Sequence, residues 1–187
     1  MPKITRDYTR NGDEGCTIAG SGEKISKSDI RINACGAIDE LNSYLGIVHA
    51  LQLSDEVKMA ISKVQNDLFI LGSDLCFTKE YKKKTPVPVI RERHLKGLET
   101  RINIISGYLE PLKNFITPSG SLQASHLQYA RTICRRAERV VVSLSEKDKV
   151  NPEAIKYLNR LSSLLFVSAR YENKRQRISE KYWDSRA

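Results

Sequence analysis

The sequence predicts an all-α fold, a five-helix up-and-down bundle that follows an ordered N-terminal loop within a single domain, residues 1–187. Three observations support this prediction. From about residue 34 onward, apolar residues recur at spacings of three and four, which is the period of an amphipathic helix. Prolines and glycines interrupt the pattern and leave moderately short connections, as in up-and-down bundles. No alternating strand pattern competes with the helical one.

The first thirty residues differ in composition from the rest of the chain. They hold four of the ten glycines, mixed with Asp, Thr, Ser and Lys: Gly12, Gly15, Gly20 and Gly22. Glycines let backbone N–H groups approach phosphate oxygens, and lysines neutralise their charge. The P-loop pattern G-x-x-x-x-G-K-[ST] is absent. Composition alone is therefore only a weak indication of a nucleotide-binding loop.

Five apolar stripes predict the five helices in order. They run over residues 34–48, 57–75, 95–109, 127–144 and 155–165. Pro86 and Pro88 separate the second stripe from the third, and a loop with Pro118 and Gly120 precedes the fourth. Asn151 followed by Pro152 is a good N-cap and first-turn pair for the fifth helix. We expect the bundle to span residues 34–176, and a basic, solvated tail to occupy residues 177–187.

Composition argues against several classes of protein. The chain has no run of 18 apolar residues that could cross a membrane, and its polar start lacks the apolar core of a signal peptide. The four cysteines are far apart, which argues against a zinc site or a disulfide framework. No histidine completes the Glu-x-x-His pattern of di-iron bundles. A cytoplasmic protein with reduced thiols is expected. The net charge of +9 does not by itself choose a partner.

The fourth helix carries a cluster of arginines in the stretch "ARTICRRAER". Arg131, Arg135 and Arg139 recur every four residues and form one line, and Arg131 and Glu138 border the apolar stripe. Arg136 lies on the far side, where it is expected to meet solvent or another chain. A half-buried guanidinium requires an anionic partner, and its planar fork suits phosphate and carboxylate. The alternative is that Glu138 and nearby acids simply neutralise the helix face.

Two polar residues on other helices are candidate partners. Asp39 shares a face of the first helix with small residues, which suggests a second packing surface, such as one between subunits. The alternative, an ordinary acid that complements the helix dipole, is about equally favoured. Asn159 flanks the stripe of the fifth helix and needs a partner. A hydrogen bond to neighbouring protein groups is the commoner case for such an asparagine.

Four ordered blocks together resemble one family. They are "YTRNGDEGCT" (8–17), "KSDIRINACGAIDELNSYLG" (27–46), "FITPSGS…HLQYARTICRRAER" (115–139) and "YLNRLSSLLFVSARYEN" (157–173). The chain resembles the PduO-type ATP:cob(I)alamin adenosyltransferases. This resemblance implies a trimer of five-helix bundles with an active site at each subunit interface. It also implies transfer of the 5′-deoxyadenosyl group of ATP to the cobalt of cob(I)alamin, which gives adenosylcobalamin and triphosphate.

The resemblance also implies roles for individual residues. The N-terminal ATP-binding loop, within region 1–33, would comprise Thr9, Arg10, Gly12, Asp13, Gly15 and Thr17, supported by Lys27. Arg131 would pair with Asp39 across the interface, beside cobalamin, and Arg135 would reach the polyphosphate. Glu138 and Asn159 would complete the nucleotide environment, with Glu138 near Mg²⁺. Phe115 would close over the lower face of the corrin ring.

The implied chemistry explains the arginines. Co(I) is the nucleophile, so no protein nucleophile is needed, and fixed positive charge would neutralise the departing triphosphate. Phe115 would fill the lower axial space without binding cobalt. Expected partners are ATP, cob(II)/cob(I)alamin, a reductase and an adenosylcobalamin-dependent enzyme, with no nucleic acid and no membrane. The chain departs from the family pattern at Asn33, Cys35, Ser119 and Ser163.

Two other functions compete with this one. A binding protein could hold nucleotide or adenosylcobalamin without turnover, and it would lose the groups that act only in the transition state. A basic nucleic-acid-binding helix would expose its arginines and bind less tightly as salt increases. The second reading gives no role to Arg131 at the core border or to the "GAIDELNS" block.

Overall fold

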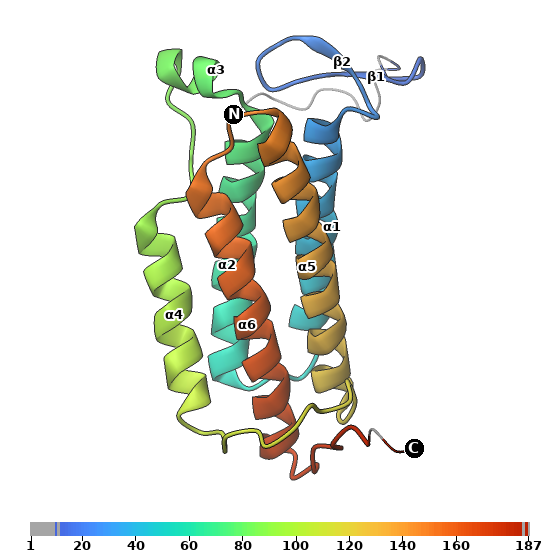
Figure 1. Cartoon of the computed structure of the whole chain (residues 1–187), viewed down its shortest axis with the longest axis vertical. Helices are drawn as coiled ribbons and strands as arrows, with labels where there is room; N and C mark the ends of the chain where they lie inside the picture. The colour runs from blue at the N-terminus through green and yellow to red at the C-terminus, as the bar shows by residue number, and fades with distance from the viewer. Residues whose placement is uncertain (1–9, 11, 185, 187) are drawn as a thin grey trace.

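The computed structural model describes residues 10, 12–184 and 186. This part of the chain forms six helices and one two-stranded sheet (Figure 1). Its elements are β1 (Cys16–Ile18), β2 (Lys24–Ser26), α1 (Ile30–His49), α2 (Asp55–Cys76), α3 (Lys79–Lys84), α4 (Glu92–Ser106), α5 (Leu122–Lys147) and α6 (Pro152–Arg175). The mostly helical fold is confirmed.

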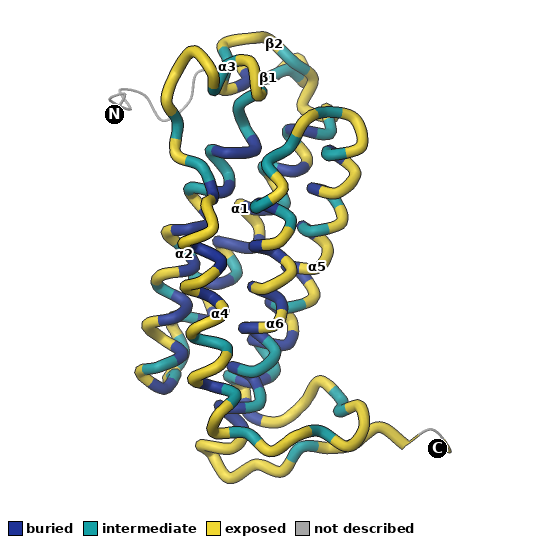
Figure 2. The backbone as a smooth tube through the Cα atoms, turned by 60° about the vertical axis from the view of Figure 1, so that its left-hand side comes forward, coloured by how far each residue is buried: buried dark blue, intermediate teal, exposed yellow. Residues whose placement is uncertain are grey.

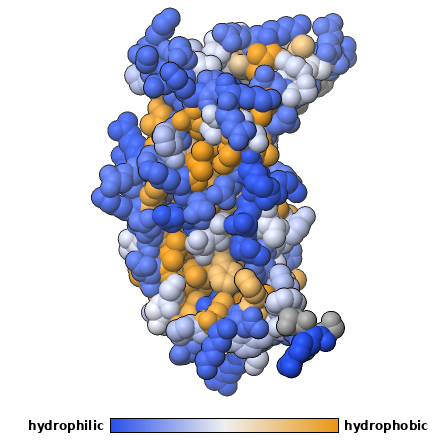
Figure 3. All heavy atoms as spheres, viewed as in Figure 1, coloured by the Kyte–Doolittle hydropathy of each residue, from blue (hydrophilic) through white to orange (hydrophobic). Residues whose placement is uncertain are grey.

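The five long helices lie side by side along the long axis and share one core (Figures 1 and 2). Apolar positions of the predicted stripes, such as Leu41, Leu68, Leu127 and Leu161, are at most 1% exposed. Figure 2 shows buried stretches alternating with exposed ones along each helix, as an amphipathic period requires. On the face seen in Figure 3, apolar surface is visible along the middle of the bundle, bordered by hydrophilic side chains.

The N-terminal region corrects the expectation that no strand is present. β1 and β2 pair antiparallel, with Thr17 opposite Ile25, and form a hairpin above the start of α1 (Figure 1). Strands of three residues are too short to show an alternating pattern in sequence. The first helix begins at Ile30, four residues before the expected start, because the Asp29 side chain caps it by accepting from the N–H of Arg31 at 2.7 Å.

A sixth, short helix was not predicted. α3 spans the lysine-rich segment that the sequence suggested was a break, and the Thr78 hydroxyl caps it at the N–H of Tyr81. The segment carries no apolar stripe, so helical periodicity could not reveal it. The predicted cap of the last helix is confirmed, since Asn151 accepts from the N–H of Glu153 at 3.1 Å.

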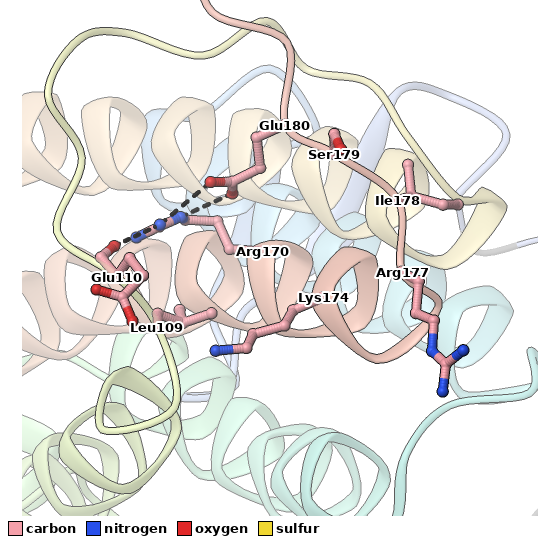
Figure 4. A pocket seen from close by; sticks show the side chains of 8 residues that line it. All are labelled: Leu109, Glu110, Arg170, Lys174, Arg177, Ile178, Ser179 and Glu180. Atoms are coloured by element: carbon pink, nitrogen blue, oxygen red, sulfur yellow. Dashed lines mark hydrogen bonds and ion pairs between the residues drawn. The ribbon is translucent and has the colours of Figure 1, made fainter.

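The described part of the C-terminal tail is mostly exposed, as expected, but one ion pair also anchors it to the bundle. Figure 4 shows Arg170 of α6 reaching between Glu180 and the backbone of Glu110. Arg170 Nε and Nη2 donate to the Glu180 carboxylate at 2.7 and 3.1 Å, and Nη2 also donates to the carbonyl of Glu110 at 2.8 Å. This bidentate ion pair is largely buried, and it holds residues 177–184 against the loop between α4 and α5.

Within the described residues, no helix combines the length and the apolar composition needed to span a bilayer.

Candidate functional site

A cleft of about 740 Å³ opens between α5, α6 and the loop that precedes α5. Its lining mixes charged, polar and apolar side chains: Leu112, Lys113, Asn114, Phe115, Ile116, Gln128, Arg131, Arg135, Ser162, Ser163, Phe166 and Val167. Two of the predicted arginines and the predicted aromatic therefore line one cavity. Because α5 and α6 pack along most of their length, rigid helices fix the arginine side of the cleft.

Arg131 is half-buried, as predicted, and other residues of the cleft hold it in place. Its Nε donates to Gln128 Oε1 at 2.9 Å, and its guanidinium carbon lies 5.9 Å from the centre of the Phe166 ring. Burial, followed by the charge of Arg135, lowers the pKa of Arg131. An arginine nevertheless stays protonated in proteins, so the cleft contains a fixed, partly desolvated positive charge.

Arg135 and Arg136 are neighbours in sequence but face different surroundings. Arg136 is exposed to solvent, as expected, and it also forms an ion pair with Glu40 of α1. Within the described residues, neither Arg131 nor Arg135 forms an ion pair with a carboxylate. Arg139 donates to the carbonyl of Arg135 at 3.2 Å and does not line the cleft. The cleft lining thus holds three positive charges, those of Lys113, Arg131 and Arg135, and no carboxylate.

Glu138 and Asn159, which the family resemblance grouped around the nucleotide, contact each other about one helical turn from the cleft-lining residues. Asn159 Nδ2 donates to Glu138 Oε1 at 3.2 Å. Asn159 is exposed rather than close to the core, and its Oδ1 accepts from Arg160 at 2.9 Å. The hydroxyls of Ser162 and Ser163 donate to the Asn159 carbonyl at 2.8 and 3.5 Å. This polar strip continues from the cleft toward Glu138.

Phe115 is 76% exposed at the mouth of the cleft. The tail holds its backbone, since the N–H of Trp183 donates to the Phe115 carbonyl at 2.8 Å. The two rings meet edge-on at 6.3 Å. A large apolar ring that the protein leaves uncovered is suited to contact an apolar face of a ligand.

The start of α5 is held by a tight corner next to this loop. Gly120 has φ of 121° and lies against Asn173 of α6. Asn173 Oδ1 accepts from the N–H of Ser121 at 2.9 Å, and its Nδ2 donates to the Ser119 carbonyl at 3.0 Å. Ser119 thus contributes its backbone to the corner, while its hydroxyl contacts Thr117 at 3.2 Å.

The predicted N-terminal loop forms a turn that leads into the hairpin. Thr9 lies outside the described residues. Arg10 has φ of 59°, its carbonyl accepts from the N–H of Asp13 at 3.3 Å, and Gly15 has φ of 77°. A side chain at Gly12 would approach Lys27 Nζ to 2.8 Å, so glycine permits the lysine to lie across this turn. Asp13 is exposed, and backbone N–H groups and a lysine amine gather at the turn.

The hairpin turn and the Phe115 loop lie at opposite ends of the helical bundle, while Arg131 and Arg135 lie between them, near the middle of α5. The hairpin sits above the N-terminus of α1, whereas the Phe115 loop precedes the N-terminus of α5 at the other end (Figure 1). The 26 residues of α5 correspond to about 39 Å of helix. Asp39 is exposed on α1, and its pairing with Arg131 is not tested within a single chain. One protomer therefore does not unite the predicted ATP loop with the arginine cleft.

Sequence reasoning missed several cleft residues. Gln128 lies three residues before Arg131 on the same helix face. This spacing alone indicates that the two side chains can contact each other. Phe166 flanks the apolar stripe of α6 in the sequence, but nothing in the sequence indicates a role for it. Trp183 gave no local signal, because only the folded chain brings the tail to Phe115. A larger cavity of about 1020 Å³, near α3 and the α5–α6 loop, contains none of the predicted site residues.

Comparison with known proteins gives a consistent result. The family model described as cobalamin adenosyltransferase matches residues 7–172. The chain is 36% identical over 182 residues to a cobalamin adenosyltransferase of Cupriavidus metallidurans, covering 97% of this chain and 95% of that protein. It is 37% identical over 185 residues to a corrinoid adenosyltransferase of Bacillus subtilis, covering 96% and 93%.

A solved structure is similar over nearly the whole chain. It is a variant PduO-type ATP:corrinoid adenosyltransferase from Lactobacillus reuteri, complexed with cobalamin and ATP. The TM-score is 0.91 at 31% identity, with 96% of this chain and 100% of that chain covered.

Proposed function

This chain belongs to the PduO-type cobalamin adenosyltransferases, and we propose how its residues divide the work of ATP-dependent adenosyl transfer to cobalamin. It is a transferase that uses ATP as the donor and a corrinoid as the acceptor. We treat its five long helices as the five-helix bundle of the family. The observation that carries the proposal is the arginine cleft, whose lining holds two arginines and a lysine, but no carboxylate, beside an exposed aromatic ring.

The site is composed of two halves contributed by two protomers of a homotrimer. One half is the hairpin turn, where Arg10, Gly12, Asp13, Gly15 and Thr17, together with Lys27 and Thr9, bind the polyphosphate of ATP. The other half is the cleft, where Arg135 reaches the same polyphosphate from the neighbouring subunit. The separation of these halves within one chain supports this arrangement, since neither half alone offers both nucleotide and corrin contacts.

The arginines act by electrostatic stabilisation. Nucleophilic attack of Co(I) on C5′ breaks the C5′–O bond and leaves negative charge on triphosphate. Arg135 is positioned to neutralise that charge, and fixed cations need little reorganisation as it develops. Arg131, held by Gln128 and stacked near Phe166, pairs with Asp39 of the neighbouring subunit and orients the corrin contact. Holding cobalt and C5′ in line supplies the remaining catalytic advantage.

The oxygen donors beside Glu138 fit magnesium. Glu138 is half-buried, and its carboxylate accepts a hydrogen bond from the Asn159 amide. The described residues contain no group of three or more His, Cys, Asp or Glu side chains that could cage a metal. Magnesium typically takes one or two carboxylates together with substrate phosphates. When bound, it adds positive charge at the phosphate oxygens, and Glu138 with Asn159 holds that end of the nucleotide.

Phe115 covers the lower face of the corrin. Its exposed ring occupies the space of the lower axial ligand without donating electrons to cobalt. A four-coordinate cob(II)alamin is more easily reduced, because loss of the axial donor lowers the orbital that accepts the electron. We propose that a reductase then supplies the electron, that an adenosylcobalamin-dependent enzyme receives the product, and that the reaction takes place in the cytoplasm.

The proposal is tested anaerobically with purified protein, chemically reduced cob(I)alamin and MgATP. We expect visible absorbance to report adenosylcobalamin, with an equal amount of triphosphate released. If ATP binds but no cobalt–carbon bond forms, the chain is a nucleotide-binding relative without turnover. Reversion of Ser119 to glycine and Ser163 to aspartate then tests whether these departures from the family pattern abolished activity.

A further inference from the structure

Two cysteines that are far apart in sequence meet beneath the N-terminal hairpin. Cys35 lies on the second turn of α1 and Cys76 is the last residue of α2. The Cys35 thiol donates to Cys76 Sγ at 3.4 Å. Both residues are partly exposed, so small reagents can reach the pair. A disulfide requires the sulfurs to come only about 1.4 Å closer.

The surroundings make the two thiols unequal. The hydrogen bond from Cys35, the charge of Arg31 and the N–H of Gly20 together lower the pKa of Cys76 to about 6, although burial opposes this. The same hydrogen bond raises the pKa of Cys35, aided by burial and by the charge on Cys76. The hydrogen bond from Cys35 to Cys76 therefore favours Cys76 as the thiolate of the pair and Cys35 as the thiol. Thiolates are the reactive form of cysteine.

Three elements hold the pair in place. Arg31, one turn before Cys35, donates to the carbonyl of Leu75 and pairs with Asp148 after α5. The hairpin lies on the same end, since Gly20 approaches the Phe77 ring so closely that a side chain there would lie 2.7 Å from it. The sulfurs are thus fixed between α1, α2 and the hairpin, and a bond between them requires no long-range movement.

We propose that Cys35 and Cys76 form a redox-active dithiol that closes to a disulfide when it meets a hydroperoxide. The Cys76 thiolate attacks one peroxide oxygen, the O–O bond breaks, and an alcohol or water leaves after taking up a proton. Cys35 sulfur then attacks the sulfenic sulfur of Cys76, forming the S–S bond and releasing water with the Cys35 proton. Two thiols and one hydroperoxide thus give one disulfide, one alcohol and one water.

The disulfide would tie the first helix to the end of the second directly under the hairpin. Oxidation therefore acts on the support of the N-terminal loop, while the arginine cleft at the other end is not touched. The inference concerns the thiols alone and does not rest on the proposed transfer reaction.

The test treats reduced full-length protein with hydrogen peroxide, then alkylates it with N-ethylmaleimide in denaturant and maps peptides by mass. We expect Cys35 and Cys76 to lose alkylation together and to appear as one cross-linked peptide pair that dithiothreitol separates. The variant Cys16→Ser should behave as the unaltered protein does. Cys35→Ser should give oxidised Cys76 without a cross-link, and Cys76→Ser should leave Cys35 alkylated.

A second measurement tests the unequal reactivity without any disulfide. At pH 7, brief exposure of the folded protein to N-ethylmaleimide should label Cys76 first. Cys35→Ala should slow this labelling about tenfold, because the thiolate loses its hydrogen-bond donor. Cross-links that involve Cys16, Cys134 or a second chain would overturn the proposal. Full alkylation of both thiols after peroxide treatment would also overturn it.

Discussion

At the residue scale, the surroundings rather than the residue type decide what an arginine does. Arg131, Arg135 and Arg136 lie within six residues of one helix. Arg136 pairs with Glu40 on the surface, a contact that typically contributes about 0–1 kcal/mol to stability. Arg131 is half-buried in the cleft and pairs with a glutamine oxygen and a ring. Its positive charge is left for a ligand or for another subunit.

Replacing Arg131 with alanine should abolish most activity while leaving the bundle folded. Loss of one fixed electrostatic contact to the reacting groups typically lowers kcat by about 10²–10³-fold. The measurement is anaerobic adenosylcobalamin formation, together with circular dichroism during heating. Arg136→Ala is the matched control and should keep activity within about twofold, because surface pairs contribute little. Unfolding of Arg131→Ala alone would instead indicate a structural arginine.

Replacing Phe115 with alanine should leave the melting temperature nearly unchanged. The ring is 76% exposed, and surface substitutions typically alter stability by about 0.5 kcal/mol or less. If the ring fills the lower axial space of the corrin, the absorbance signature of four-coordinate cob(II)alamin should be lost and turnover should fall. Met59→Ala, which removes an exposed apolar side chain on α2, is the control and should retain that signature. Retention of the signature in Phe115→Ala would show that another group displaces the axial ligand.

At the element scale, the corner before α5 sets the position of the cleft. Gly120 and the buried Asn173 join the start of α5 to the end of α6, and Asn173 satisfies one backbone group on each side of the glycine. The Phe115 loop leads directly into this corner, and an isolated β-bridge between Ile116 and Tyr182 joins this loop to the C-terminal tail. The helix ends, rather than the helix middles, therefore shape the mouth of the site.

Replacing Gly120 with alanine should destabilise the protein and displace the loop. The new Cβ would lie 2.2 Å from Asn173 Oδ1 at a φ of 121°. Backbone strain and two weakened hydrogen bonds together cost roughly 3 kcal/mol. Thermal unfolding should report a Tm lower by about 6–12 °C.

The control substitution is expected to change the stability of the protein in the opposite direction. Gly97 lies in α4, and a Cβ there meets no atom within 4 Å. Gly97→Ala should therefore stabilise the protein by about 0.5–1 kcal/mol. If Gly120→Ala and Gly97→Ala changed the Tm equally, a side chain at position 120 would not strain the corner.

At the scale of the whole molecule, the N-terminal hairpin is separated from the Phe115 loop by the length of the helical bundle. The hairpin with Lys27 and Gly12 is close to the start of α1, while the Phe115 loop closes the other end (Figure 1). Since the cleft arginines lack carboxylate partners within the described residues, a neighbouring copy is a natural source of both the acid and the nucleotide loop. Closed rings of identical subunits bring different surface patches together in this way.

Mixing two inactive variants should therefore restore activity. Lys27→Ala damages the hairpin and Arg131→Ala damages the cleft. In a mixed oligomer, however, the intact hairpin of an Arg131→Ala subunit can meet the intact cleft of a Lys27→Ala subunit. Random assembly from equal amounts gives about one quarter of intact sites. The measurement is adenosylcobalamin formation after the two variants are co-expressed and purified together.

Controls make this result specific. Either variant alone should stay inactive, and a mixture of separately assembled proteins should recover activity only as subunits exchange. Absence of recovery in co-expressed protein of confirmed mixed composition would mean that each chain builds its site by itself.

Local pattern in the sequence determined the helices and much of the cleft. Period and caps predicted the apolar stripes and the start of α6 at Asn151 and Pro152, because these depend on neighbours three or four residues away. The same spacing placed Arg131 at the core border, whereas the grouping of Glu138 with Asn159 came from the family resemblance. The ordered family blocks then indicated the reaction, since they combine residues whose chemistry is needed together.

Only the tertiary structure decided the contacts between distant segments. The pairing of Arg136 with Glu40, the docking of the tail on Phe115 and the meeting of Cys35 with Cys76 have no local signal in the sequence. The hairpin strands are too short to show a period, and α3 lacks an apolar face. Each of these features depends on which helix ends the packed core brings together, and local periodicity does not specify that.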